Sequence, residues 1–157
     1  MIILGIDPGT TRIGYGVIRA SGNSLIHVAS GVLEINPAST DAEHLHEIGR
    51  ALEKLITDIG PEKIGVERLF FSKNKKTALS VAEARGVILE TIAKKHIFLY
   101  ELTPNEVKLA VTGNGNSSKQ AVAKMVSLLL HFDTKTLLDD ATDALAIAIA
   151  SANTRIE

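Results

Sequence analysis

The first third of the chain consists of short segments in which hydrophobic residues run together or alternate with polar ones. Its first seven residues form an apolar run that ends at Asp7-Pro8-Gly9. Two more apolar segments follow, with connections marked by Gly and Ser, which is typical of strands joined by tight turns. The pattern therefore predicts three strands, at 1–7, 12–19 and about 25–35, that form an antiparallel meander.

Helical periodicity starts near residue 41. Leu and Ile recur at helical spacing between Leu45 and Ile59, which predicts a helix over 41–59 that Gly60-Pro61 ends. Strand and helix signals then alternate along the rest of the chain. They predict a strand at 63–71, a helix at 77–95, a strand at 96–100, a short helix opened by Thr103-Pro104, a loop at 113–118, and helices at 118–130 and from about 139 to 152.

This order of elements predicts a mixed α/β fold. The first, fourth and fifth strands are connected through helices, so we expect them to be parallel, and we expect the second and third strands to form an antiparallel edge. The prediction is therefore a five-stranded mixed sheet flanked by helices. A length of 157 residues fits a single domain, 1–157, with one core.

Composition excludes several classes of protein. The chain contains no cysteine, which excludes a disulfide scaffold and a thiolate metal site and suits a reducing cytosol. Its first residues have the pattern of a strand and not of a signal peptide, and no apolar run approaches the roughly 20 residues of a membrane span. We therefore expect a soluble, cytoplasmic protein with no membrane contact.

The distribution of charge is less neutral than the net charge of −1 suggests. The segment 63–95 carries eight Lys and Arg against three Glu, and the rest of the chain has an excess of acids. Such a basic segment can bind the phosphates of a nucleic acid, or it can be an ordinary solvated helix with lysines. Charge alone leaves both interpretations open.

Four carboxylates stand in apolar surroundings. Asp7 ends a strand, Glu67 lies within one, and Asp140 and Asp143 are three residues apart at the start of an apolar helix, so they share one helix face. Close carboxylates raise one another's pKa, and an unpaired charge is costly to bury, so a fold that gathers several of them usually holds a cation. Oxygen ligands alone favour Mg²⁺ or Mn²⁺.

Each acid also has a simpler explanation. A turn cap before Pro8-Gly9 explains Asp7, and an ion pair with Arg68 or Lys63 explains Glu67. The helix dipole explains the acids of the last helix, Asp139, Asp140 and Asp143. All of these explanations together are less economical than one cation site, because one sheet can bring the four positions together.

Four segments of the chain form a set: GIDPGTTRIGYGVI at 5–18, VERLFFSKN at 66–74, ARGVI at 84–88 and DDATDALAIAIA at 139–150. With weaker similarity at 103–122, the set resembles the RuvC family of Holliday junction resolvases over nearly the whole chain. The resemblance implies a ribonuclease H-like fold, a homodimer and metal-dependent paired nicking of four-way DNA junctions in recombination and repair. Branch-migration motor proteins are expected partners by the resemblance only.

The resemblance assigns roles to the acids. Asp7 and Glu67 fall on the first two catalytic acids of the family, and Asp140 and Asp143 fall on the last pair. The implied chemistry is two-metal hydrolysis with two Mg²⁺ per subunit, or Mn²⁺, in which Asp7 bridges the ions. One ion presents a water as hydroxide and the other stabilises the leaving 3′ oxygen. Asp139 is an extra acid before the last pair, and whether it shares in metal binding stays open.

The resemblance also implies DNA contacts. Phe70 falls on the aromatic that related proteins place against bases at the crossover, and strand alternation would put it opposite Glu67 and Phe71. Two core aromatics are an equally good interpretation. Arg68 stands where a Gln is more usual. The expected phosphate and activity contacts come from five lysines, Lys73, Lys75, Lys76, Lys108 and Lys119.

The helix at 77–95 is rich in small residues that permit close helix approach. Resemblance places a two-fold dimer contact near them, and the alternative is that this helix only covers the sheet. The small residues are Ala78, Ala82, Ala84 and Gly86.

Other functions fit parts of the sequence. GIDPGTT also resembles the first phosphate loop of actin-like ATPases and sugar kinases, which need a second related domain and a second phosphate loop. A non-catalytic nucleic-acid-binding module would not need four acids. Another nuclease of the same fold, acting on a different structured substrate, fits the charges equally well. His44 and His46, flanked by Glu43 and Glu47, are two residues apart on a helix, which indicates an exposed polar patch and not a metal site.

Overall fold

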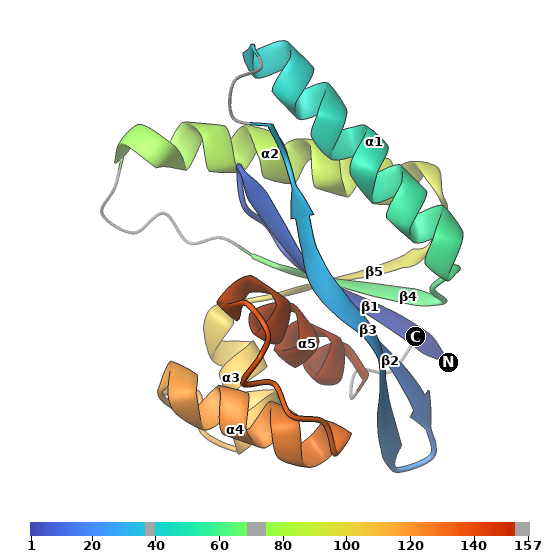
Figure 1. Cartoon of the computed structure of the whole chain (residues 1–157), viewed down its shortest axis with the longest axis vertical. Coiled ribbons are helices and arrows are strands. Elements are labelled where there is room, and N and C mark those ends of the chain that lie inside the picture. Colours follow the sequence, from blue (N-terminus) through green and yellow to red (C-terminus); the bar gives the residue numbers. More distant parts are fainter. Residues whose placement is uncertain (37–39, 69–74, 153–157) are drawn as a thin grey trace.

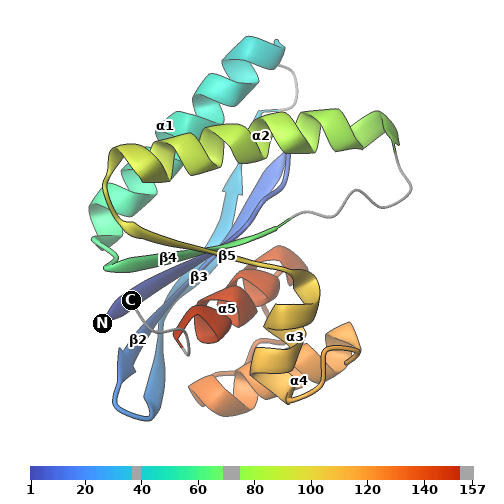
Figure 2. The ribbon, with the colours of Figure 1, turned by 180° about the vertical axis from the view of Figure 1, so that it is seen from behind.

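The computed structural model describes residues 1–36, 40–68 and 75–152. A central sheet separates two layers of helices (Figures 1 and 2). The strands are β1 (Ile2–Asp7), β2 (Arg12–Ser21), β3 (Ser24–Glu34), β4 (Lys63–Glu67) and β5 (Phe98–Leu102). The helices are α1 (Asp41–Ile59), α2 (Lys75–Lys94), α3 (Pro104–Thr112), α4 (Lys119–Leu130) and α5 (Asp139–Ala152).

The sheet has the mixed topology that the sequence predicts. Its strand order is β3-β2-β1-β4-β5. β1, β4 and β5 are parallel, and β2 pairs antiparallel with both β1 and β3. This five-stranded order with helices on both faces confirms the ribonuclease H-like arrangement.

Each face of the sheet has its own hydrophobic core. On one face α1 and α2 pack through Ile48, Leu52, Ile88 and Ile92, all fully buried. On the other face α5 lies directly on the strands, and α3 and α4 pack outside it (Figure 2). Since α5 is covered on all sides from Ala144 to Ser151, every residue of this stretch before Ser151 is Ala, Leu or Ile.

Glycines in the strands set the distance between α5 and the sheet. A Cβ added to Gly16 would lie 2.5 Å from the amide nitrogen of Leu145, and Cβ atoms on Gly5 and Gly14 would overlap the carbonyl oxygens of Ala144 and Asp140. The sequence pattern predicts strands here but gives no reason for glycine at these positions. Their role is close backbone approach, which places the first turn of α5 against β1 and β2.

Two predicted strands have different bounds in the structure. β4 ends at Glu67, whereas the apolar pattern predicts a strand to residue 71. β5 begins at Phe98, two residues later than predicted. The reason for the second difference is that the chain turns at His96, which has a positive φ of 54°, directly after α2. Hydrophobic residues in that turn resemble a strand in sequence without pairing as one.

Within the described part of the chain, no helix is both long and apolar enough to cross a membrane.

Candidate active site

Asp7 and Glu67 lie side by side at the ends of two parallel strands. The register pairs Ile6 of β1 with Val66 of β4, so the next residue on each strand is the acid. Both acids are half-buried. The structure therefore confirms the predicted adjacency of these two carboxylates at one edge of the sheet.

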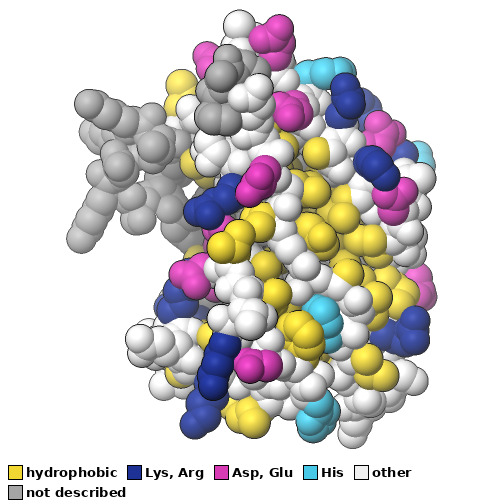
Figure 3. Space-filling view, in the orientation of Figure 1, with side chains coloured by type: hydrophobic (Ala, Val, Ile, Leu, Met, Phe, Trp, Pro, Cys, Tyr) yellow, Lys and Arg dark blue, Asp and Glu magenta, His cyan; other side chains and the backbone are white. Residues whose placement is uncertain are grey.

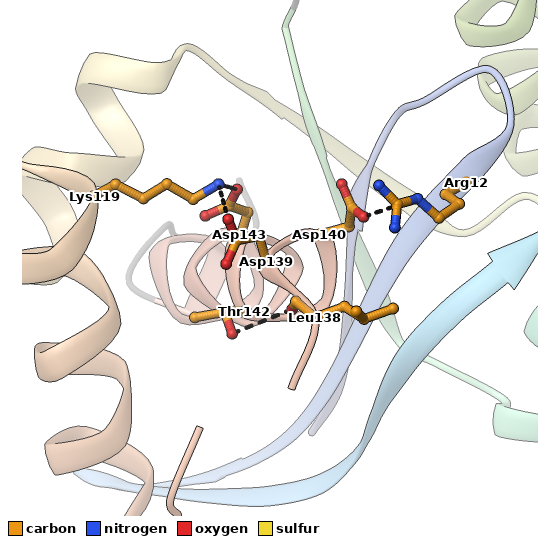
Figure 4. A network of polar contacts seen from close by, with 7 residues as sticks. All are labelled: Arg12, Lys119, Leu138, Asp139, Asp140, Thr142 and Asp143. Atoms are coloured by element: carbon orange, nitrogen blue, oxygen red, sulfur yellow. Dashed lines mark hydrogen bonds and ion pairs between the residues drawn. The ribbon is translucent and has the colours of Figure 1, made fainter. Parts of the chain in front are cut away.

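Asp140 and Asp143 approach from the first turns of α5. The close contact of Gly14 with the backbone of Asp140 fixes the start of this helix beside β2. Asp140 turns toward Arg12, with 3.5 Å between the carboxylate Oδ2 and the guanidinium Nε. Asp143 turns to the opposite side, toward Lys119 at 2.9 Å (Figure 4). The two acids share a helix end but have different cationic partners.

The electrostatics place all four acids in one cluster. The pKa of Asp7 is raised from 3.8 to about 7, first by burial and then by the charges of Glu67, Asp143 and Asp140. Burial, followed by the charge of Asp143, also raises the pKa of Glu67. Carboxylates that raise one another's pKa in this way lack enough positive charge among them.

Two lysines partly compensate for this excess. Lys119, the first residue of α4, lowers the pKa of both Asp7 and Glu67, and Lys108 of α3 lowers that of Glu67. Burial alone would lower the pKa of Lys119, but its hydrogen bonds and ion pairs with Asp143 and Asp139 raise it. Lys119 and Lys108 therefore act electrostatically on the acids, and the contacts with DNA predicted for them stay predictions.

Asp139 has a different environment from the other acids. Its side chain is 82 % exposed, and it lies 3.3 Å from Lys119 on the outer side of the helix start. It is not among the charges that raise the pKa of Asp7. Asp139 is therefore a surface partner of Lys119 in the first turn of α5.

The carboxylates are not arranged as a closed set of metal ligands. In residues 1–36, 40–68 and 75–152, no three His, Asp or Glu side chains surround a common point closely enough to hold an ion. Arg12 and Lys119 draw Asp140 and Asp143 to opposite sides (Figure 4). Arg12 is a site residue that the sequence analysis does not identify, because no spacing relates β2 to α5.

The predicted DNA contacts divide into described and undescribed residues. Phe70 and Lys73 lie outside the described residues, and so do the side chains of Lys75 and Lys76 at the start of α2. β4 ends at Glu67, where the amide of Arg68 donates to the carbonyl of Leu102 at 2.6 Å in the pairing with β5. The predicted alternation of side chains at Phe70 lies beyond this strand and outside the described residues, so it stays a prediction.

The described basic side chains of the segment 63–95 do not form one surface. Lys63 is fully buried and donates to the carbonyl of Ser151 at 2.6 Å. Lys94 and Lys95 form ion pairs with Glu90 and Glu53. On the face shown in Figure 3, basic and acidic side chains are interspersed around hydrophobic side chains. The local excess of basic residues in the sequence is therefore only partly available to a ligand.

A cleft adjoins the acidic cluster. Its volume is about 1100 Å³, and it lies between α4, the segment 131–137 and the start of α5. Lys119, Asp139 and Asp143 line it next to the acids, and Lys124 and Lys135 line it further away. This cleft has no signature in the sequence, because its shape depends on how the connection from α4 to α5 packs.

The raised pKa of Asp7 predicts a pH-dependent stability. A carboxyl with a raised pKa in the folded state favours folding at low pH, and this contribution is lost between the unfolded and folded pKa values, here from about 4 to about 7. The free energy of unfolding of Asp7→Asn should therefore rise relative to the parent across this range, by on the order of 2–4 kcal/mol. Urea denaturation of both proteins in EDTA at a series of pH values measures this difference. A difference that is constant with pH would contradict the electrostatic coupling of Asp7.

Comparison with known proteins agrees with this geometry. The profile of the family described as Crossover junction endodeoxyribonuclease RuvC matches residues 3–151. A protein of that description from Pseudothermotoga lettingae is 44% identical over 148 residues, which are 94% of this chain and 91% of the relative. Among solved structures, Thermus thermophilus RuvC in complex with Holliday junction substrate is 29% identical, with a TM-score of 0.88 over 96% of this chain and 92% of that one. The yeast mitochondrial Holliday junction resolvase shares the fold, with a TM-score of 0.73 over 96% of this chain and 77% of the other at 18% identity.

Proposed function

The chain belongs to the RuvC family of crossover junction endodeoxyribonucleases, and we propose that it resolves four-way DNA junctions by hydrolysing phosphodiester bonds at its acidic cluster. The observation that carries the proposal is the convergence of Asp7, Glu67, Asp140 and Asp143 from three separate parts of the chain. The experiment that tests it is cleavage of a labelled four-way junction beside a duplex of the same sequence. Action in recombination and repair is part of this proposal.

The donor set fits a hard divalent cation. All four side chains offer carboxylate oxygens, and burial, followed by repulsion from the other three acids, raises the pKa of Asp7 to about 7. A cation between them would remove this repulsion, and oxygen ligands match the preference of Mg²⁺ or Mn²⁺. We propose that Asp7, Glu67, Asp140 and Asp143 would hold two such ions. When bound, the ions would supply an activated water and stabilise the leaving 3′ oxygen.

The other residues of the site would orient the phosphate and balance charge. Lys119 would donate to a phosphate oxygen once Asp143 turns toward the cation, since one lysine cannot serve both at full strength. Lys108, which already lowers the pKa of Glu67, would add positive charge on the same side. Arg12 would keep Asp140 oriented from the β2 side. The half-buried position of Asp7 and Glu67 would limit the access of bulk water to the reacting group.

A matched pair of variants distinguishes the cation ligands from the surface acid. Asp143→Asn should lower the rate of junction cleavage roughly 100-fold or more, because it removes a charge coupled to both Asp7 and Glu67. Asp139→Asn, four residues earlier on the same helix, should change the rate by less than about threefold, because its carboxylate only pairs with Lys119 at the surface. Single-turnover cleavage of one labelled junction measures both rates. Equal losses in the two variants would contradict this assignment.

Paired nicks require two equal sites on one junction. We propose that a two-fold homodimer supplies them through α2, whose Leu79 is 67 % exposed and whose Gly86 has open space around it. Of the other small residues in this helix, Ala84 faces the core of its own chain and is not available. Sedimentation of the protein alone and on junction DNA tests the dimer, and a monomer in both states would contradict it. A cytoplasmic location stays a prediction from composition, and work with branch-migration motor proteins stays a prediction from the family resemblance.

A further inference from the structure

The imidazole ring of His44 joins two loops at the edge of the sheet. His44 lies in the first turns of α1 and is half-buried. Its Nε2 lies 2.6 Å from the carbonyl oxygen of Thr10, and its Nδ1 lies 3.2 Å from the carbonyl oxygen of Asn36. Thr10 belongs to the loop between β1 and β2, and Asn36 follows β3. The His44 side chain thus links α1 to two segments that are distant in sequence: the loop after β1 and the segment after β3.

Both partners of the ring are hydrogen-bond acceptors only. A neutral imidazole has one N–H donor and one bare nitrogen, so it can satisfy one carbonyl and must present a lone pair to the other. An imidazolium ring has two N–H donors and satisfies both. Only a doubly protonated ring can therefore donate to both carbonyls, and the contact with Thr10 is the shorter of the two.

The charged groups around His44 are compatible with a positive ring. On α1, Asp41 and Glu47 lie three residues before and after it, and the Glu47 carboxylate accepts from the amide of Asn36 at 3.3 Å. On the strands, Arg12 of β2 lies opposite Glu34 of β3 in the antiparallel register, beyond the two loops.

The loop that His44 holds carries site residues at both ends. Asp7 precedes it, and Arg12, the partner of Asp140, follows it. A second contact fixes the same loop, because the amide of Ile35 donates to the carbonyl of Thr11 at 2.9 Å. A shift of this loop would therefore move Asp7 and the Arg12–Asp140 pair together.

We propose that His44, as a doubly donating imidazolium, is a positioning residue that holds the 8–11 loop and thereby the geometry of the acidic cluster. This inference rests on the proposed nuclease function. Within the segment Glu43–Glu47, His44 is therefore neither an exposed polar residue nor a metal ligand, but a residue that positions a loop. His46, two residues later, is exposed and has no part in it.

Three variants test the catalytic part of the proposal. His44→Ala should lower kcat for junction cleavage roughly tenfold with KM within about twofold, since small displacements of reacting groups cost rate more than binding. His44→Arg should retain nearly the parental kcat, because a guanidinium keeps several N–H donors at every pH. His46→Ala is the matched control on the same helix and should equal the parent.

The pH profile separates positioning from a general structural role. The ratio of parental kcat to that of His44→Arg should be near one at pH 6 and should fall several-fold by pH 9, as the histidine ring loses its second donor and the arginine does not. A merely structural histidine would give a ratio that is constant with pH. A constant ratio, or an unchanged kcat in His44→Ala, would overturn the proposal.

A spectroscopic measurement is independent of cleavage. In ¹⁵N NMR spectra of the metal-free protein at pH 6, both ring nitrogens of His44 should be protonated, and the amides of Gly9 and Thr10 should shift as that ring titrates. One unprotonated ring nitrogen at pH 6, or amide chemical shifts of the loop that do not change with those of the ring, would overturn the positioning role of His44. Parental protein that cleaves no DNA would overturn the proposed function and the catalytic role together. Parental cleavage with normal His44→Ala activity would overturn only the role of His44.

Discussion

Asp7→Asn is expected to cleave four-way junctions roughly 1000-fold more slowly than the parent, a loss of about 4 kcal/mol of transition-state stabilisation. Asp7 is central to the acidic cluster: its pKa of about 7 reflects burial and the charges of Glu67, Asp143 and Asp140. Asparagine has the same shape but one oxygen fewer and no charge. Cation binding and rate should therefore fall together while the fold is kept.

Junction binding by Asp7→Asn should be retained. The carboxylate repels phosphate, so its removal takes away no attractive contact with DNA. The affinity in EDTA, measured by band shift, should be equal to that of the parent or higher. The variant should also be at least as stable as the parent at pH 8, since it lacks the repulsion described above. Cleavage by Asp7→Asn at more than about one tenth of the parental rate would contradict the proposed site.

Gly5→Ala is expected to cause the largest loss of stability, about 3 kcal/mol or more. Its new Cβ would overlap the carbonyl oxygen of Ala144 and lie 2.6 Å from the amide nitrogen of Ala148, and both are backbone atoms of α5. Backbone in the middle of a packed helix cannot rotate away as a flexible side chain can. Either α5 moves off the sheet, carrying Asp140 and Asp143 with it, or the domain unfolds.

Gly86→Ala is the matched control for the fold of the single chain, measured on the monomer because Gly86 belongs to the proposed dimer contact: it adds the same methyl group at an exposed helix position with nothing of its own chain within 4 Å. It should leave the protein equally stable or stabilise it by about 0.5–1 kcal/mol. Urea denaturation followed by circular dichroism measures both variants. A Gly5→Ala protein with parental stability and parental cleavage would contradict the close packing of α5 on β1.

Much of the fold follows from local sequence. The apolar runs of β1 and β4, the periodicity of α1 and the apolar stretch of α5 after Asp143 predict the mixed sheet, and with β1 and β4 as neighbours they predict the convergence of Asp7 with Glu67. The predictions differ from the structure where hydrophobic residues lie outside regular pairing. His96 turns the chain at a positive φ and delays β5, and β4 ends at Glu67 although apolar residues continue beyond it. Propensity does not encode such ends, because the neighbouring strand determines them.

The sequence predicts the acids of the site, but it predicts fewer of the residues that form ion pairs with them. Asp140 and Asp143 share a helix face by spacing alone, whereas the ion pair between Arg12 and Asp140 joins β2 to α5 and exists only in three dimensions. The glycines opposite α5 have no distinctive pattern in sequence, since a strand glycine looks the same beside a helix as beside water. His44 likewise gains its meaning from two backbone carbonyls, which sequence does not reveal.

The most direct test of the central claim is cleavage of three labelled DNA substrates by the parental protein in Mg²⁺. A four-way junction, a duplex of matched sequence and the corresponding single strand would be incubated with equal concentrations of enzyme, with EDTA and Asp7→Asn as controls. The account predicts paired, symmetric nicks in the junction and cleavage of the duplex and single strand at least roughly 100-fold slower. Equal cleavage of all three substrates, or cleavage of the junction in EDTA, would contradict it.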